Sequence, residues 1–274
     1  MVHGVSRPLP RQLLIGVVHL VPLPGSPWFR GDIGELTEHA LRDAHALAVG
    51  GMNALLLENF GDAPFHKDQV PPETIANLAV VAAEVRRAVK LPLGINVLRN
   101  DAHAALAIAQ AVGAKFIRVN VHVGAMLTDQ GLIEGRAAHL LRLRRSLGAD
   151  DIRIFADVFV KHAVPLGEQS LLDTAHDTVG RGLADAVILT GPSTGAACSL
   201  DNVRSVKAGL PHVPVLVGSG VTPRTIRDTL AVADGVIVGT SLKADGIVTN
   251  PVEIARVREL ITAARAPARK SRKP

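Results

Sequence analysis

The sequence predicts a single-domain (β/α)₈ barrel, the TIM-barrel fold. Short apolar runs alternate with helical patterns along the chain, which is typical of a parallel α/β fold. Eight such units of roughly 30 residues favour a closed barrel, because an open doubly wound sheet usually stops at about five to seven strands. The length of 274 residues also suits one barrel, which typically takes about 250 residues.

The predicted strands are the eight apolar runs that punctuate this pattern. They cover residues 13–20, 53–58, 93–98, 116–121, 152–158, 186–190, 213–218 and 235–239. Helices are expected between them, and Glu73–Val89 and Ala102–Val112 are rich in strong helix formers. Capping signals for helix starts are Asn100-Asp101, Ser199, Thr222-Pro223 and Asn250-Pro251. Signals for helix ends are Gly50-Gly51, Gly113 and Gly148.

Composition limits the class of protein. Hydrophobic residues make up 47% of the chain and aromatic residues 3%, so the core must be large and aliphatic. The single cysteine, Cys198, excludes an intrachain disulfide and a multi-thiolate metal site, and it suits a reducing compartment. Residues 1–12 lack a signal-peptide pattern, and no apolar run approaches the roughly 20 residues of a membrane span. We therefore expect a cytoplasmic protein without a transmembrane segment.

The chain divides into an N-terminal arm (1–12), the barrel (13–265) and a disordered basic tail (266–274). The formal net charge is +5, and the last ten residues, RAPARKSRKP, carry five basic residues and no acidic one. The rest of the chain is formally neutral. Charge therefore argues against nucleic-acid binding by the barrel, whereas binding through the basic tail stays open.

Barrel enzymes place their catalytic groups at the carboxyl ends of the strands. The polar residues predicted there are His19, Glu58, Asn59, Asn96, Arg118, Asn120, Asp157, Thr190, Ser219, Thr240 and Ser241. Phe116, Arg118 and Asn120 share one face of their strand because side chains alternate, and Ile117 and Val119 suit the helix side. Arg118 should thus point into the barrel mouth. It requires an anionic partner there. That partner is either a carboxylate of the protein, in a purely structural ion pair, or a bound anion.

Several of these residues are candidates for proton transfer. Asp157 and Glu58 are expected to form an acid/base pair or to bind a divalent metal; the alternative is that both are buried and neutralised by Arg118 and Lys161. His19 is the best histidine candidate, with a purely structural role as the alternative. Lys161 is expected to pair with a substrate anion or to form a Schiff base, or else to be a solvated lysine. Close histidine spacing typical of zinc sites is absent, so a metal stays undecided, and no organic cofactor is predicted.

The remaining candidates would bind substrate. Asn96, Arg118, Asn120 and Thr190 are expected to orient it. Trp28, in the proline-rich loop 19–32, would cover the pocket, stack on a base or form a subunit contact. Two turns, Gly218-Ser219-Gly220 and Gly239-Thr240-Ser241, follow the seventh and eighth strands, where barrels bind phosphate on backbone amides and a helix N-terminus. The alternative is that these glycines only form tight turns.

Several of these segments together resemble the BtpA/SgcQ family. They are GVVHLVPLPGSP (16–27), LLLENFGDAPF (55–65), GINVLRND (94–101), IRVNVHVGAMLTDQGLIEG (117–135), FADVFVKHAVPL (155–166), AVILTGPSTG (186–195) and VLVGSGVTP (215–223). The resemblance implies a (β/α)₈ barrel. A cyanobacterial member is associated with photosystem I biogenesis, and an enterobacterial one lies among sugar phosphotransferase genes. Some members are labelled phosphoribosylanthranilate isomerase, an enzyme that uses a cysteine after its first strand and an aspartate after its fifth strand. Asp157 matches the position of that aspartate, whereas His19 stands in place of the cysteine.

Two main hypotheses follow. The first is an enzyme that acts on a phosphorylated sugar or nucleotide-like metabolite, as an isomerase, a lyase or a catalyst of glycosidic-bond cleavage. The second is a non-enzymatic assembly or regulatory factor that keeps the barrel as a scaffold. A homo-oligomer is expected in either case.

Overall fold

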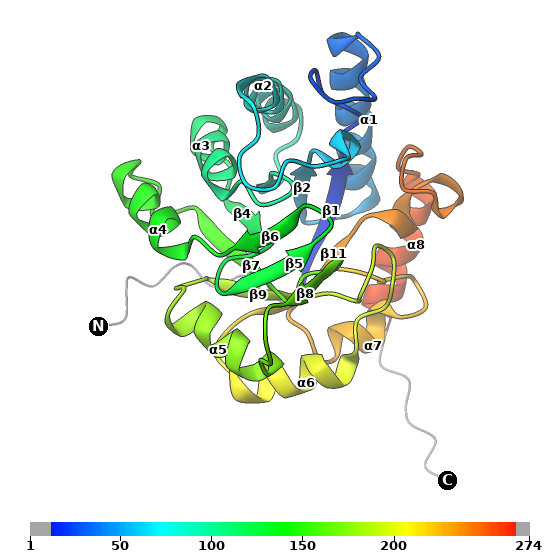
Figure 1. The fold of residues 1–274 in the computed structure, drawn as a ribbon. Coiled ribbons are helices and arrows are strands. Elements are labelled where there is room, and N and C mark those ends of the chain that lie inside the picture. Colours follow the sequence, from blue (N-terminus) through cyan, green and yellow to red (C-terminus); the bar gives the residue numbers. More distant parts are fainter. Residues whose placement is uncertain (1–11, 267–274) are drawn as a thin grey trace.

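Neighbouring parallel strands pair all the way round to close a barrel in the computed structural model, which describes residues 12–266 (Figure 1). The eight strands of the barrel are β1 (Leu13–His19), β2 (Ala54–Glu58), β3 (Leu93–Asn96), β4 (Phe116–Val119), β7 (Arg153–Val158), β9 (Ala186–Leu189), β10 (Val215–Val217) and β11 (Gly235–Val238). β11 pairs back onto β1, with Leu13 opposite Gly235. Each strand lies inside its predicted range, so the predicted fold is confirmed. Most of the predicted arm and tail falls outside the described residues.

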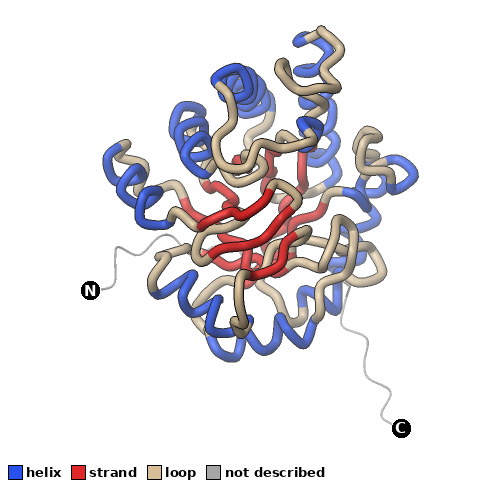
Figure 2. Tube along the Cα trace, viewed as in Figure 1, coloured by secondary structure: helices blue, strands red, loops and turns tan. Residues whose placement is uncertain are grey.

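Helices surround the barrel, as the blue segments of Figure 2 show around the red strands. They are α1 (Ile33–Gly50), α2 (Pro72–Ala88), α3 (Ala102–Val112), α4 (Ala137–Ser146), α5 (Leu171–Gly180), α6 (Leu200–Gly209), α7 (Ile226–Leu230) and α8 (Ile254–Arg265). Short 3₁₀ turns η1 (Phe60–Asp62), η2 (Thr240–Leu242) and η3 (Ala244–Gly246) lie in the loops. No helix in the described range is long and apolar enough to cross a membrane.

Most predicted helix boundaries are confirmed by their capping geometry. The Asp101 side chain accepts a hydrogen bond from the amide of Ala104, and the Ser199 hydroxyl accepts one from Asn202. Gly51 and Gly113 adopt the left-handed conformation at the ends of α1 and α3.

Two predicted helix starts are wrong, because other hydrogen bonds claim those residues. The Thr222 hydroxyl contacts the Thr225 hydroxyl at 3.3 Å, and the Thr225 hydroxyl accepts the amide of Thr222, so a turn follows Thr222-Pro223 and α7 begins only at Ile226. The Asn250 side chain donates to the carbonyl of Ala244, so Asn250-Pro251 belongs to the loop and α8 begins at Ile254.

The barrel has an inner and an outer apolar layer. The inner layer consists of Leu13, Ile15, Val17, Ala54, Leu56, Phe116, Phe155, Ala186, Ile188, Leu216 and Ile237. Phe116 and Phe155 stack there with ring centroids 4.8 Å apart. Ile117 and Val119 instead pack in the layer between strands and helices. The predicted orientation of the fourth strand is therefore confirmed, and Arg118 lies one level above the Phe116 layer.

A small antiparallel sheet, which the sequence did not predict, lies over one end of the barrel. It contains β5 (Ala125–Thr128), β6 (Gly131–Glu134) and β8 (Ala163–Pro165), in the order β6-β5-β8, and in Figure 1 it crosses in front of the parallel strands. Its inner side chains, Met126 and Ile133, pack on Val121 and Val160. The sheet thus joins the loop after β4 to the loop after β7.

A fully buried ion pair fixes the loop after β11 to α1. The Lys243 ammonium lies 2.5 Å from a carboxylate oxygen of Asp43, and the two side chains are 1% and 0% exposed. The other oxygen of Asp43 accepts the amide of Val252 at 2.9 Å. Because η2 directly precedes Lys243, this pair also fixes the turn that follows the last strand.

Replacing Asp43 by alanine should lower the free energy of unfolding by about 3–5 kcal/mol, because the Lys243 ammonium would remain buried without its carboxylate. Urea denaturation measures the change. Adding Lys243→Met to Asp43→Ala should restore part of the loss, since the uncompensated charge is then removed. Asp150→Ala, which breaks an exposed ion pair with Arg145, should cost about 1 kcal/mol or less. Equal losses for Asp43→Ala and Asp150→Ala would contradict the structural role of the buried pair.

Candidate functional site

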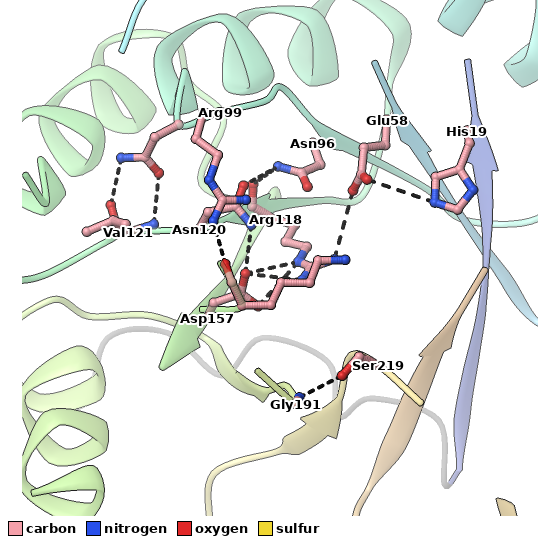
Figure 3. Close-up of polar contacts among 12 residues, drawn as sticks. His19, Glu58, Asn96, Arg99, Arg118, Asn120, Val121, Asp157, Gly191 and Ser219 are labelled. Atoms are coloured by element: carbon pink, nitrogen blue, oxygen red, sulfur yellow. Dashed lines mark hydrogen bonds and ion pairs between the residues drawn. The ribbon is translucent and has the colours of Figure 1, made fainter. Parts of the chain in front are cut away.

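A buried ion pair between β4 and β7 lies at the centre of the barrel mouth (Figure 3). Arg118 Nη2 lies 3.1 Å from Asp157 Oδ2, and Arg118 Nε lies 3.3 Å from each carboxylate oxygen. The two side chains are 3% and 0% exposed. The internal Arg–carboxylate pair that the sequence left open is therefore present. It neutralises the charge of both side chains inside the barrel.

Two asparagines complete this pair. The Asn120 amide nitrogen donates to Asp157 Oδ2 at 2.7 Å, and its oxygen accepts from the Asn96 amide nitrogen at 3.1 Å. Asn96 also donates to the carbonyl of Arg118 at 3.2 Å. Consecutive donors and acceptors thus fix the orientation of each side chain.

Glu58 and His19 lie beside the pair, on adjacent strands whose register places them opposite each other. Glu58 Oε2 is 3.9 Å from Arg118 Nη1, and Glu58 Oε1 is 3.9 Å from His19 Nε2. Among the described residues, nothing donates a hydrogen bond to either oxygen of Glu58. This carboxylate is therefore buried yet free to accept a proton or a hydrogen bond from a ligand. Burial, and then nearby Lys243, Lys161 and Arg118, hold the pKa of His19 well below its usual value.

Lys161 enters the mouth from the loop after β7. Phe159 and His162, on either side of it, both have left-handed backbones, with φ of 53° and 57°, which is unfavourable for side chains of this kind. His162 Nε2 accepts the amide of Thr194 at 3.2 Å and so fixes this turn to the loop after β9. Burial, followed by the charge of Arg118, lowers the pKa of Lys161. The ammonium has no ion-pair partner within 4.0 Å in residues 12–266.

Two adjoining cavities open at this mouth. The first, of about 170 Å³, is lined by all six residues predicted to bind phosphate and by His19, Glu58, Arg118 and Lys161. The second, of about 450 Å³, is lined by Phe60, Ala63, Phe65, Leu98, Arg99, Asn120, Asp129 and His162 together with Glu58, Arg118, Lys161 and Thr194. The last four residues line both cavities. Within the described range, the ionisable groups therefore face a divided cavity and not a closed network.

The two glycine turns contribute backbone to the first cavity. The Ser219 hydroxyl accepts the amide of Gly191 at 2.6 Å and donates to the carbonyl of Ala196 at 2.9 Å, and the Ser241 hydroxyl donates to the carbonyl of Val221 at 2.7 Å. Both hydroxyls are thus occupied by the protein. In contrast, the amides of Ser219, Gly220, Gly239, Thr240 and Ser241 donate to no acceptor within residues 12–266.

Steric crowding explains the glycines themselves. Gly220 has a φ of +69°, and a Cβ there would lie 2.4 Å from the Cα of Ala197. At Gly239 a Cβ would lie 2.5 Å from the His19 ring. The helix predicted to begin at Thr222-Pro223 has only five residues and starts at Ile226, so the expected helix N-terminus does not contribute to this site.

Four predicted site residues lie outside both cavities. Asp157 and Asn96 are buried behind Arg118 and Asn120. Thr190 lines neither cavity, and its buried hydroxyl has no hydrogen-bond partner in the described range. Trp28 is 68% exposed and does not cover the mouth. The sequence interpretation missed Arg99, Phe60 and Phe65, although Arg99 directly follows the predicted strand 93–98.

The described residues contain no group of three or more His, Cys, Asp or Glu side chains arranged to hold a metal ion. Glu58 and Asp157 instead lie on either side of the Arg118 guanidinium, which occupies the place where a shared cation would bind.

Comparison with known proteins agrees with this barrel. The sequence model of the BtpA family matches residues 11–266. The chain belongs to the BtpA family. The resemblance predicted from the sequence is therefore confirmed.

Relatives extend over nearly the whole chain. Photosystem I biogenesis protein BtpA of Synechocystis is 47% identical over 250 residues, which cover 91% of this chain and 87% of that protein. An uncharacterized protein of Pyrococcus furiosus is 50% identical over 248 residues, covering 90% and 93%. The putative sgc region protein SgcQ of Escherichia coli is 31% identical over 250 residues, covering 90% and 92%.

Solved structures with a similar fold share little sequence. N-(5'-phosphoribosyl)anthranilate isomerase of Pyrococcus furiosus superposes with a TM-score of 0.56 at 13% identity, covering 93% of this chain and 99% of that one. A structure described as native KDPGal gives 0.58 at 14% identity, covering 94% and 95%. At these identities the likeness establishes the barrel fold.

The lowered pKa of His19 predicts a loss of stability in acid. Below a pH of about 6.5 the unfolded chain binds a proton at this histidine that the native state does not, so the free energy of unfolding falls as the pH falls. His19→Gln should lose less stability than the wild type between about pH 7.5 and pH 5 in urea denaturation. His39, His122 and His162 also have lowered pKa values, so part of the slope remains. His176→Gln, at an exposed position, controls for loss of a histidine as such. Identical slopes for wild type and His19→Gln would contradict the prediction.

Proposed function

We propose that this protein is an enzyme that acts on a phosphorylated sugar or a nucleotide-like metabolite. One observation carries the proposal. Five residues whose backbone amides have no acceptor in residues 12–266 line the same cavity as Glu58, Lys161 and His19. Unpaired amides in a cavity suit an anion, and ionisable groups that converge on a cavity suit catalysis.

The phosphate would bind on the turns 218–220 and 239–241. Glycine backbone allows a phosphate to approach closely, and the Ser219 and Ser241 hydroxyls hold the turns in shape. The support is the set of free amides rather than a helix dipole, because α7 begins too late and is too short.

Proton transfer would be carried out by Glu58, with Lys161 and His19 beside it. Glu58 lines both cavities and accepts no protein hydrogen bond within the described range, as a general base requires. Lys161, whose pKa is lowered by burial, is suited to return a proton or to react as an amine. Isomerases, lyases and enzymes that cleave glycosidic bonds all use such groups, so the reaction class remains a choice among these three.

The other site residues would orient the substrate or hold the orienting side chains in place. Arg118 and Asn120 would orient substrate oxygens, since both line a cavity. Asp157 and Asn96 would act through them, because their contacts are with Arg118 and Asn120. Direct binding by Thr190 or Trp28 finds no support in their positions. A cytoplasmic homo-oligomer remains part of the proposal.

An assembly or regulatory factor is the second candidate. Its support is the name of the Synechocystis relative and a row of apolar side chains on the outer face of the antiparallel sheet. Leu127 and Val164, paired across β5 and β8, are 56% and 63% exposed. The first candidate is favoured, because a scaffold gives no reason for a charged cavity. Turnover would decide between the two.

Phosphate binding is tested by a charge at Thr240, which lines the first cavity and makes no side-chain hydrogen bond in the described range. Thr240→Glu should weaken binding of ribose 5-phosphate about tenfold or more by repulsion at close range, and added salt should reduce the difference. Isothermal titration calorimetry measures the affinities. Thr240→Gln, of equal size and without charge, should bind nearly as the wild type does. Equal affinities for the two variants would exclude the phosphate from this cavity.

The role of Glu58 is tested on any phosphorylated sugar that raises the melting temperature of the wild type. Glu58→Gln should lower the turnover number by roughly 10²- to 10⁴-fold with little change in affinity, because the base is lost and the shape is kept. The same variant should reduce incorporation of solvent deuterium into the substrate, measured by NMR. Asp157→Asn should lower the melting temperature as well, since it breaks the pair with Arg118. Undiminished turnover in Glu58→Gln would remove Glu58 from the mechanism.

A further inference from the structure

Arg99 is a buried cation that the proposed chemistry does not use. It follows β3 and is only 4% exposed. Its backbone amide donates to the carbonyl of His66 at 3.0 Å, and its Nη2 donates to the carbonyl of Lys161 at 2.6 Å. Its Nε is buried and has no hydrogen-bond partner in residues 12–266. The guanidinium therefore has unused donor capacity next to the second cavity, which it lines.

The carboxylates nearby do not neutralise Arg99. No carboxylate oxygen in the described range lies within 4.0 Å of its guanidinium. Asp157 is held by two nitrogens of Arg118 and by Asn120, and Glu58 also lies beside Arg118. Figure 3 shows the Arg99 side chain reaching toward this centre from the loop after β3. Burial lowers the pKa of Arg99, as expected for a guanidinium without a paired carboxylate.

Four buried charged side chains and the partly buried Lys161 together carry one more positive than negative charge. Arg99, Arg118 and Lys161 supply three positive charges, and Glu58 and Asp157 supply two negative charges. A further carboxylate, Asp129, lines the edge of the cavity from the turn between β5 and β6, but it is exposed and accepts from the side chain of Gln130. One monovalent anion would complete the balance, and an unpaired buried cation is costly without it.

The apolar wall of the second cavity indicates what kind of anion fits. Phe60, Ala63, Phe65 and Leu98 line the side next to Arg99. A carboxylate on a carbon skeleton places one charge on the guanidinium and its carbon atoms on this wall. A second phosphate would bring up to two charges and a larger hydration shell against the same apolar surface.

We propose that Arg99 binds a carboxylate of the substrate in the second cavity. The substrate would thus be a phosphorylated carboxylic acid, with its phosphate on the glycine turns and its reacting atoms beside Glu58 and Lys161, which line both cavities. The part of this proposal that concerns the phosphate rests on the proposed function, whereas the part that concerns the carboxylate rests on Arg99 alone.

Two matched pairs of compounds separate these halves in calorimetric titrations of the full-length protein. 6-Phosphogluconate and glucitol 6-phosphate share a six-carbon chain and a phosphate, and only the first has a carboxylate. Benzoate and benzamide have the same shape, carry no phosphate, and differ in charge. The wild type should prefer the carboxylate of each pair roughly tenfold to a hundredfold, the usual effect of one charged hydrogen-bonding partner.

Variants assign the preference to Arg99. Arg99→Gln should abolish it and leave the affinity for glucitol 6-phosphate unchanged, since glutamine keeps a donor for the Lys161 carbonyl. Arg99→Lys should retain part of the preference, and Arg204→Met, on the exposed surface of α6, should retain all of it. A readout that needs no variant is the Arg99 Nε–H resonance in NMR, which should shift with benzoate and not with benzamide.

The outcomes distinguish the two proposals. Arg99-dependent binding of benzoate, with no binding of either phosphorylated compound or inorganic phosphate, would keep the carboxylate site and end the phosphate proposal. No preference for the carboxylate in either pair would overturn the inference about Arg99. A preference that persists in Arg99→Gln would overturn it as well, and so would an unshifted Nε–H resonance.

Discussion

The pairing of Arg118 with Asp157 is the constraint on which the rest of the site depends. A guanidinium buried between barrel strands is costly unless a carboxylate lies against it, and the contact of Arg118 with Asp157 joins the side chains of β4 and β7 at the mouth. Asn120 and Asn96 then take the only orientations that satisfy Asp157 and each other. Once Asp157 is used in this way, Glu58 is the buried carboxylate that stays available to a ligand within the described residues.

Three separate devices shape the cavities around that pair. The buried contact between Lys243 and Asp43 holds the turn after β11 against α1, and the hydroxyl of Ser219 holds the loops after β9 and β10 together. The left-handed residues beside Lys161 return its side chain to the mouth at a cost in backbone energy. Each device uses protein groups for structure and leaves backbone amides or charged side chains available in the cavity.

The sequence predicts the parallel barrel well, because each buried strand is a short apolar run and each helix a longer amphipathic segment, and both patterns can be recognised from neighbouring residues alone. The inward direction of Arg118 follows from its separation by two residues from Phe116. The antiparallel sheet could not be predicted in the same way, since strands such as β8 have only three residues and pair with distant segments. Arg99 escaped notice because it lies one residue beyond the predicted strand 93–98, for which Asn96 was the polar candidate. The burial of Asp157 behind Arg118 depends on distances that alternation does not provide.

The antiparallel sheet has a consequence for how sequences of this kind can diverge. β5 and β8 belong to loops that start from different barrel strands, yet Leu127 pairs with Val164 and Met126 with Pro165. A one-residue insertion in β5 before Met126 would turn that side chain away from Val160, and one in β8 would shift its pairing with β5 and disturb the turn that carries Lys161. The two loops are therefore constrained at their paired strands, and a viable insertion must fall outside β5 and β8.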